Sequence, residues 1–402
     1  MALLSVSEAL ARILDTARIT AAELVGLNLA LGRTLANDIV ARRDQPPFDA
    51  SAMDGYALRA EDVTTVPAQL TLIGTSAAGH GFKGVVKAGM AVRILTGAPL
   101  PAGADTVVIQ ENTHVDGQFI VLDGPTAKGR NIRLQGLDFA KGAALVPAGV
   151  KLAARDIGLA ASAGAAFILV RRKPLIAIFS TGDELVEAGQ TPRPHQITSS
   201  NAPALSAFVR ACGGDVLDLG IVRDDLSATI SALKNASRAD IVLTTGGASV
   251  GDHDYVQEAL KKYGVQIDFW KIAMRPGKPF MFGTKGKQRV LGLPGNPVAA
   301  LVCAQLFLRP LIEAMLGLQL SIELTLAKLG SDLAANDQRQ DYVRSMLIVA
   351  ADGLRTATPL SKQDSSMQRL MRNAGCLIVR PPFAPDVKAG DLVEILLFPD
   401  GV

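Results

Sequence analysis

Residues 240–259 constrain the fold more than any other part of the sequence. They begin with an apolar run at 241–243 that is rich in β-branched residues and too short for a helix, which predicts a buried parallel strand. Two adjacent glycines, Gly246 and Gly247, then allow another group to approach the backbone closely. A helix is expected next, with Asp254 as its cap. A strand, a glycine loop and a helix start in this order would present backbone N–H groups to an anion.

Two interpretations of this loop stay open. The loop could bind a phosphate-bearing ligand, or it could be a tight connection that needs glycine only to turn. Asp252 and Asp254 favour the first, because acidic residues beside a phosphate site suggest a bridging Mg²⁺, which prefers oxygen ligands. Asp254 as a simple helix cap remains the alternative.

From residue 171 onward, strands and helices alternate. Strands are predicted at 174–179, 215–222, 241–243 and 290–293, and helices at 201–211, at 226–234 and after Pro297. This order predicts a doubly wound, mostly parallel α/β sheet whose ligands gather at the carboxyl ends of the strands. The polar loops 181–184, 223–225, 245–254 and 294–297 all fall there. Asn296 is expected to cap the last helix and Pro297 to occupy its first turn.

The flanking regions have other patterns. The N-terminal residues predict a helix at 5–14, a second short helix at 21–29 and a strand near 38–41, and the mixed pattern returns at 153–170. Residues 65–145 carry short strands between glycines and prolines, and the tail from about 324 predicts a small β-barrel or sandwich. We therefore expect an α+β domain from 1–48 and 142–172, a β-rich insertion at 49–141, an α/β domain at 173–322 and a β domain at 323–402.

Composition narrows the classes of partner. The 41 basic and 38 acidic residues give a net charge of +3, too balanced to favour nucleic acid or a membrane surface. The three cysteines are far apart and the four histidines show no metal spacing, so neither a disulfide framework nor a zinc site is expected. The N-terminus lacks a signal-peptide pattern, and the apolar helix at 297–308 is too short to span a bilayer. These observations predict a cytoplasmic protein.

A basic segment lies between two of the predicted strands. Lys271, Arg275 and Lys278 surround a Pro-Gly turn and predict a strand-turn-strand that could hold an oxyanion. Each charge-assisted hydrogen bond would contribute about 1.5–3 kcal/mol. A solvated basic hairpin is the alternative.

Six motifs occur in a familiar order along nearly the whole chain. They are PPFDASAMDGYAL, RILTGAPLPAGAD, STGDEL, TTGGASVGDHDY, WKIAMRPGKPF and LGLPGNPVAA. Without the other five, the first motif could simply be a hinge between domains. Together the six resemble the molybdopterin molybdenumtransferases, the molybdenum insertases that include bacterial MoeA and the gephyrin E domain.

The resemblance implies a specific reaction. Members insert molybdenum from molybdate into adenylylated molybdopterin, cleave its pyrophosphate linkage with Mg²⁺ and release AMP. It also implies a homodimer whose active site is shared between subunits, and the adenylyltransferase that makes the substrate as a candidate partner. Charge neutralisation by a metal ion and preorganised donors suits the cleavage of a phosphoanhydride.

The resemblance also assigns roles to residues. The expected catalytic residues are Asp54, Thr96, Glu184, Asp224 and Asp254, with Asp54 and Thr96 reaching the site from the second subunit and Glu184 and Asp254 holding the metal. The expected substrate-binding residues are Gly246, Gly247, Ser249, Lys271, Arg275, Lys278, Pro294, Asn296, Pro297, Arg344 and Ser365, of which Lys271, Arg275, Arg344 and Ser365 would hold molybdate. Asp138 matches a further acidic position of the family.

Two departures from the family pattern concern this site. Members often have lysine where Arg275 stands, and a guanidinium is a planar fork rather than a point charge. The family commonly has Asp-Thr-Asn where this chain has Ser199, Ser200 and Asn201. The rival functions are a non-catalytic gephyrin-like scaffold, a nucleotidyltransferase that makes the adenylylated pterin, and an insertase that uses tungstate.

Overall fold

The computed structural model describes residues 3–246, 255–319 and 324–398. The chain divides into two compact units, Leu24–Val170 and a second unit built from Met1–Glu23 with Arg171–Val402. The predicted boundaries of the four domains remain predictions.

A six-stranded sheet forms the centre of the larger unit, in the order β16-β13-β17-β21-β20-β18. The strands are β13 (Leu175–Thr181), β16 (Asp215–Val222), β17 (Ile241–Thr245), β18 (Gln266–Phe269), β20 (Met281–Lys285) and β21 (Gln288–Leu293). The first four in this order pair in parallel, and β20 and β18 are antiparallel. The predicted doubly wound, mostly parallel sheet is confirmed.

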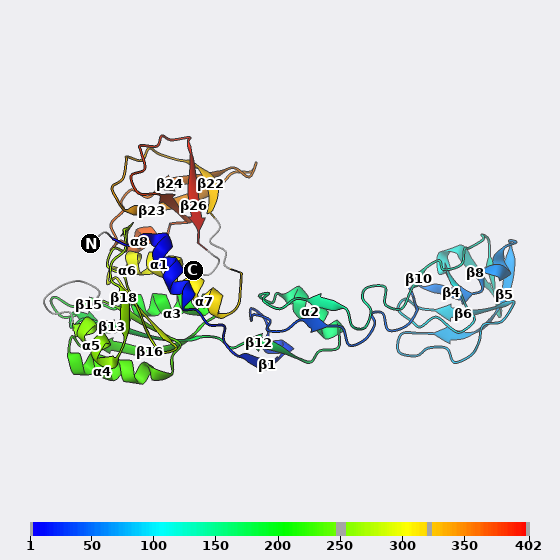
Figure 1. Cartoon of the computed structure of the whole chain (residues 1–402). Coiled ribbons are helices and arrows are strands. Elements are labelled where there is room, and N and C mark those ends of the chain that lie inside the picture. Colours follow the sequence, from blue (N-terminus) through cyan, green and yellow to red (C-terminus); the bar gives the residue numbers. More distant parts are fainter. Residues whose placement is uncertain (1–2, 247–254, 320–323, 399–402) are drawn as a thin grey trace. The chain divides into compact units, whose positions relative to one another are not determined.

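Helices cover both faces of this sheet (Figure 1). Ile176 and Ile178 of β13 pack with α1, α3, α6 and α7, whereas Ala177 and Phe179 pack with α4 and α5. The helices are α1 (Val6–Asp15), α3 (Asn201–Ala211), α4 (Leu226–Asn235), α5 (Tyr255–Tyr263), α6 (Pro297–Cys303) and α7 (Arg309–Met315). Because successive residues of a strand face opposite sides, one uninterrupted apolar run supplies both cores.

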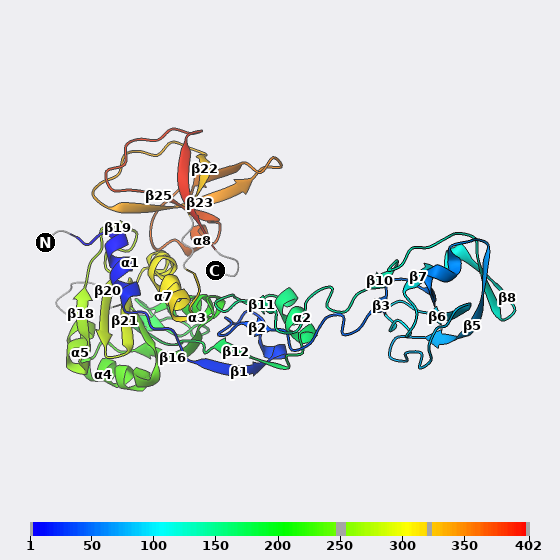
Figure 2. The same cartoon turned by 45° about the vertical axis from the view of Figure 1, so that its right-hand side comes forward.

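The tail forms a closed barrel of five strands (Figure 2). These are β22 (Leu324–Leu329), β23 (Gln340–Val349), β24 (Arg355–Pro359), β25 (Cys376–Arg380) and β26 (Leu392–Leu397). The barrel closes because β23 pairs with both β24 and β25. A short strand from the sheet region, β19 (Met274–Arg275), adds to β23 in parallel. The β domain predicted for the tail is confirmed.

The smaller unit is mostly β-structure. Its main sheet has the order β7-β4-β6-β5-β9-β8. The strands are β4 (Gly55–Leu58), β5 (Ala68–Ser76), β6 (Met90–Ile94), β7 (Thr106–Ile109), β8 (Thr113–Asp116) and β9 (Phe119–Leu122). Short pairs join β2 (Ile39–Val40) to β11 (Ala144–Val146) and β3 (Ala50–Ser51) to β10 (Ile132–Arg133). The helix α2 (Ala154–Ser162) packs beside β2 and β11. The predicted β-rich region is confirmed.

The helix predicted at 21–29 is wrong. The segment forms β1 (Ala22–Gly26), which pairs with β12 (Phe167–Arg171), followed by a 3₁₀ turn, η1 (Leu27–Leu29). Leu24 and Leu29 are both exposed, so these leucines form no buried helix face. Pairing with a strand about 140 residues away in sequence has overridden the local helix propensity.

The helix predicted at 297–308 is longer than expected. It continues through a π-helical segment, η5 (Ala304–Leu308), into α7. The prediction ended at Leu308, but the π-helical segment lies just before Pro310, which has no N–H to donate, and the helix continues past that proline. The full run Pro297–Met315 is long and apolar enough to cross a membrane, so the prediction that this helix is too short was wrong. However, 78% of its 18-residue apolar window is buried inside the protein.

Four short elements complete the described secondary structure of the larger unit. They are the pair β14 (Leu185–Val186) and β15 (Ile197–Thr198), the 3₁₀ turn η4 (Ala236–Arg238) and the helix α8 (Gln368–Met371). The smaller unit adds the 3₁₀ turns η2 (Ala60–Val63) and η3 (Gln110–Asn112).

Candidate functional site

The polar loops of the larger unit meet at one edge of the sheet, as predicted. Glu184 follows β13, Asp224 follows β16, Gly246 follows β17 and Pro294 follows β21. These four parallel strands are neighbours in the sheet, so their carboxyl ends lie side by side. The Asp224 N–H donates to the Asp183 carboxylate at 3.3 Å, which joins the first two loops.

Gly246 allows the β17 loop to pass directly against β13. Its φ is +88°, and a Cβ at this position would lie 2.4 Å from the carbonyl oxygen of Thr181 and 3.1 Å from its hydroxyl. No other residue type fits without moving a strand end. The buried Thr181 hydroxyl has no hydrogen-bond partner among the described residues, which leaves a donor available beside the loop.

Asn201, the first residue of α3, ties two of these loops together. Its side-chain amide donates to the Thr245 hydroxyl and to the Gly295 carbonyl, both at 2.7 Å. The end of β17 and the loop after β21 are therefore held at a fixed separation by one side chain. Ser200 beside it accepts a hydrogen bond from Gln368 at 2.6 Å, so α3 also contacts the α8 segment.

The barrel domain contributes a loop to the same edge. The Asn296 amide donates to the Ser365 hydroxyl at 2.8 Å, and the Val298 N–H donates to the Ser365 carbonyl at 3.0 Å. Asn296 precedes α6 with Pro297 at its first turn, as predicted, but its side chain bonds Ser365 instead of capping the helix. Arg344, on β23, donates to the Asp364 carbonyl at 3.4 Å. The structure thus brings Asn296, Ser365 and Arg344 together.

Burial changes the chemistry of Arg344. Its side chain is buried, and this burial lowers the pKa of the guanidinium while Asp364 opposes the change. A guanidinium still carries its charge at neutral pH after such a shift. Arg344 is therefore a buried cation within one residue of Ser365.

The strand-turn-strand predicted around Lys271, Arg275 and Lys278 is present, because β18 and β20 pair antiparallel on either side of it and the Ile272 N–H donates to the Lys278 carbonyl at 3.1 Å across the Pro-Gly turn. The sequence did not predict a further pairing inside this connection. Met274 and Arg275 form β19, which pairs with β23 of the barrel rather than with a strand on the far side of the Pro-Gly turn. Arg275 forms an ion pair with Asp341 of β23. The local sequence pattern does not indicate the pairing of β19 with β23, because the partner strand lies about 65 residues later in the sequence. Arg275 and Lys278 are exposed, whereas Lys271 is partly buried.

In the smaller unit, Asp54 and Thr96 lie in direct contact. One carboxylate oxygen of Asp54 accepts from the Thr96 N–H at 2.6 Å and from its hydroxyl at 2.8 Å. These hydrogen bonds, the backbone bond first, lower the pKa of Asp54, and Arg93 adds to the effect. Arg93 lies over the Tyr56 ring at 5.0 Å and is fixed there. Asp54 is thus held as a carboxylate.

We expect Thr96→Val to raise the pKa of Asp54 toward its ordinary value, because the hydroxyl bond is lost while the backbone bond remains. A carboxyl whose folded pKa is lowered contributes stability above its unfolded pKa of about 3.8 and loses it as pH falls through the folded value. The pKa of Asp54 can be followed by carbon NMR during an acid titration. Thr113→Val is the control, because that hydroxyl donates to the Gln110 carbonyl at 2.8 Å and not to a carboxylate. An unchanged Asp54 pKa in Thr96→Val would contradict the assignment.

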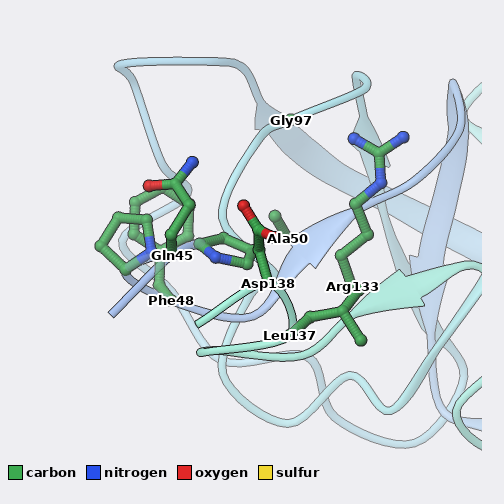
Figure 3. A pocket seen from close by; sticks show the side chains of 9 residues that line it. Gln45, Phe48, Ala50, Gly97, Arg133, Leu137 and Asp138 are labelled. Carbon is green, nitrogen blue, oxygen red and sulfur yellow. The ribbon is translucent and has the colours of Figure 1, made fainter. Parts of the chain in front are cut away.

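A pocket of about 570 Å³ opens in the smaller unit beside Asp138 (Figure 3). It is lined by Gln45, Pro46, Pro47, Phe48, Ala50, Gly97, Arg133, Leu137 and Asp138. Gly97 follows Thr96, and the prolines and Phe48 belong to the motif that also contains Asp54. Residues 46–50, which from composition alone could belong to a hinge between domains, therefore form one wall of this pocket.

Several predicted residues lie outside the described part of the chain. They are Gly247, Ser249, Asp252 and Asp254 of the β17 loop. Among residues 3–246, 255–319 and 324–398, no three acidic, histidine or cysteine side chains gather closely enough to hold a metal ion. The described residues alone do not complete the predicted magnesium site, and Glu184 is its only predicted ligand whose placement is described.

Comparison with known proteins identifies the family. Residues 4–164 match the MoeA N-terminal region (domains I and II), residues 177–314 a probable molybdopterin-binding domain, and residues 326–398 the MoeA C-terminal region (domain IV). The chain belongs to the molybdopterin molybdenumtransferase family. The family predicted from the six motifs is confirmed.

Relatives of this family match the chain over most of its length. A molybdopterin molybdenumtransferase of Nostoc sp. is 39% identical over 342 residues, which cover 83% of this chain and 78% of the relative. One from Haemophilus influenzae is 35% identical and covers 94% of each chain. The crystal structure of a molybdopterin biosynthesis MoeA protein from Pyrococcus horikoshii covers 99% of this chain and 100% of its own, with a TM-score of 0.87 and 30% identity.

Sequence reasoning missed two residues that shape the loops at the strand ends. Asn201 stands at a helix start, where asparagine is ordinarily read as a cap, and only the fold reveals that it joins two loops. Gly182 has φ +149°, and a Cβ there would lie 2.5 Å from the Glu184 carboxylate. The sequence does contain a signal for Gly182. It stands two residues before the candidate acid Glu184, and a glycine at this distance allows the Glu184 side chain to fold back over the turn.

Proposed function

We propose that this protein is a molybdenum insertase. It transfers molybdenum from molybdate to adenylylated molybdopterin, cleaves the pyrophosphate linkage and releases AMP. The observation that carries the proposal is the Asn296–Ser365 contact, which joins the barrel domain to the carboxyl edge of the sheet. A nucleotide site at this edge needs only the sheet, whereas an insertase also needs a place for the oxyanion.

The nucleotide and pyrophosphate would lie along the strand ends. Gly246 lets the β17 loop pass directly against β13 there, and the Thr181 hydroxyl offers a donor with no partner among the described residues. Asn201 fixes the spacing of the loops on either side. Gly247 and Ser249 continue this cradle in the proposal, and Pro294 shapes the neighbouring wall.

Molybdate would be held where the barrel meets the sheet unit. Arg344 is a buried cation beside the Ser365 loop, and Arg275 lies on β19, which is paired with the strand that carries Arg344. Lys271 and Lys278 precede and follow Arg275 in the same segment. A tetrahedral dianion needs several positively charged donors that are already in place, because each hydrogen bond offsets part of the hydration free energy that the dianion loses on binding.

Acidic residues complete the proposed chemistry. Glu184, with Asp254, would hold a Mg²⁺ ion that neutralises charge on the pyrophosphate, and Asp224 lies on the next loop. Asp54 and Thr96 would reach this site from a second subunit of a homodimer. The lowered pKa of Asp54 supports a role as an anion, since its carboxylate stays charged and can accept a hydrogen bond at neutral pH.

The proposal is tested by AMP release from adenylylated molybdopterin with Mg²⁺, in the presence and absence of molybdate. The insertase should release AMP faster when molybdate is present. Tight substrate binding without release would instead favour a scaffold. Formation of adenylylated pterin from ATP and molybdopterin would favour the nucleotidyltransferase, and faster release with tungstate than with molybdate would favour the tungstate enzyme.

We expect Lys271→Ala to weaken molybdate binding more than nucleotide binding. One charge-assisted hydrogen bond is lost, which costs about 1.5–3 kcal/mol of molybdate binding free energy. Calorimetry with inorganic molybdate and with adenylylated molybdopterin measures both affinities. Lys287→Ala is a charge-matched control. Lys287 lies in the turn between β20 and β21, at the end of β21 opposite the carboxyl edge of the sheet. Equal weakening of both ligands would show that Lys271 does not act on the oxyanion.

A further inference from the structure

Arg275 and Asp341 form an ion pair between two aligned strands. They are direct partners in the register of β19 and β23, and the Arg275 guanidinium donates to one oxygen of the Asp341 carboxylate. Half of the Arg275 side chain is exposed, whereas Asp341 is only 7% exposed. The pair therefore has a buried acid at its base and a cation that faces solvent.

The Asp341 carboxylate bonds no other cation among the described residues. Arg339 is bonded to Asp337, and Arg380, which faces Asp341 across β23 and β25, donates to the Ala384 and Pro385 carbonyls. The second oxygen of Asp341 is buried and has no hydrogen-bond partner in the described structure. A buried carboxylate is costly unless it is paired, so the fold holds Asp341 against Arg275 at some expense of stability.

The planar shape of the guanidinium allows Arg275 to bond two groups at once. A guanidinium has five N–H donors in a rigid plane and can bond a carboxylate at one edge and an oxyanion at another. The other donors of Arg275 have no protein partner in the part of the chain that is described. A lysine here would be a point charge on a flexible stem, and a carboxylate beside it would not orient it in the same way.

We propose that Asp341 is a positioning residue for the oxyanion substrate, acting through Arg275. The inference rests on the proposed function, because it assumes that Arg275 binds molybdate. Asp341 holds the long Arg275 side chain in one orientation, so that little side-chain freedom is lost when the oxyanion binds. The arginine in place of the lysine common in this family thereby comes with its own anchor on β23.

The test is a double-mutant cycle in the full-length protein. Asp341→Asn should raise the KM for molybdate roughly tenfold, the size expected when one charge-assisted hydrogen bond no longer fixes the cation. The kcat at saturating molybdate and the KM for adenylylated molybdopterin should change less than about twofold by the same reasoning. In an Arg275→Ala background, Asp341→Asn should have no further effect on the KM for molybdate.

The controls separate positioning from folding. Asp341→Glu retains the charge, so its KM for molybdate should lie between those of the wild type and of Asp341→Asn. Asp332→Asn removes the acid of another ion pair of the barrel, with Lys388 at 2.9 Å, and should leave the KM unchanged. The melting temperature of each variant reports on the fold.

Each outcome decides the inference. An Asp341→Asn effect of equal size in the Arg275→Ala background would overturn it, because Asp341 would then act without Arg275. An unchanged or lower KM for molybdate in Asp341→Asn would also overturn it, the lower value showing that the carboxylate repels the dianion. A wild-type protein that neither binds inorganic molybdate nor responds to it would overturn the proposed function, and this inference with it.

Discussion

Replacing Glu184 by alanine should leave the folded protein intact and reduce AMP release by roughly 100-fold or more, the size found when a preorganised electrostatic contact is removed from an active site. Glu184 is exposed and accepts no hydrogen bond from another side chain among the described residues, so folding gains little from it. Its carboxylate lies folded back over Gly182, at the carboxyl end of the strand next to β17. The kcat for AMP release and the melting temperature measure the two effects.

Glu187→Ala provides the matched control. Glu187 is an exposed acid three residues later, just after the short strand β14, and its removal changes the local charge by the same amount. Its effect on AMP release should be small. Equal losses in Glu184→Ala and Glu187→Ala would mean that only the general negative charge of the turn matters, and normal turnover in Glu184→Ala would remove this residue from the site.

Gly246→Ala should both destabilise the protein and weaken its binding of adenylylated molybdopterin. The added Cβ would meet the Thr181 carbonyl at 2.4 Å, a contact that cannot be accommodated by a side-chain rotation. Steric displacement and the positive φ together should reduce the free energy of unfolding by about 2–4 kcal/mol. Urea unfolding and a binding titration measure the two quantities.

Gly286→Ala separates the two causes of this loss. Gly286 has φ +57° in the turn between β20 and β21, and a Cβ there meets nothing within 4 Å. It should therefore show only the backbone cost, about 1 kcal/mol, with normal substrate affinity. If Gly246→Ala is no less stable than Gly286→Ala, then the close approach to Thr181 does not constrain the loop.

The sequence predicts those elements whose signals are local. The helix Asn201–Ala211 and the strand Asp215–Val222 begin and end at the residues that their patterns indicate, because the apolar spacing and the glycines between them lie within a short stretch. The meeting of four polar loops at one edge also follows from the strand and helix order, since parallel strands share a direction.

The contacts that complete the site are not local. β19 pairs with β23, Asn296 bonds Ser365, and Asn201 bonds the loops after β17 and β21, and each of these joins segments that are far apart in the sequence. A sequence pattern reports the face of a strand or helix, but not which distant strand or loop it meets. For the same reason, the sequence around Arg275 indicates the strand-turn-strand of β18 and β20 but not the pairing of β19 with the barrel.

The central claim is tested most directly by measuring AMP and molybdenum-loaded pterin in the same reaction. Purified protein would be mixed with adenylylated molybdopterin, Mg²⁺ and molybdate, and both products would be quantified over a single turnover. We predict that AMP and molybdenum-loaded pterin appear in equal amounts and at the same rate. AMP release without transfer of molybdenum to the pterin, or no release at all, would contradict the assignment of this protein as a molybdenum insertase.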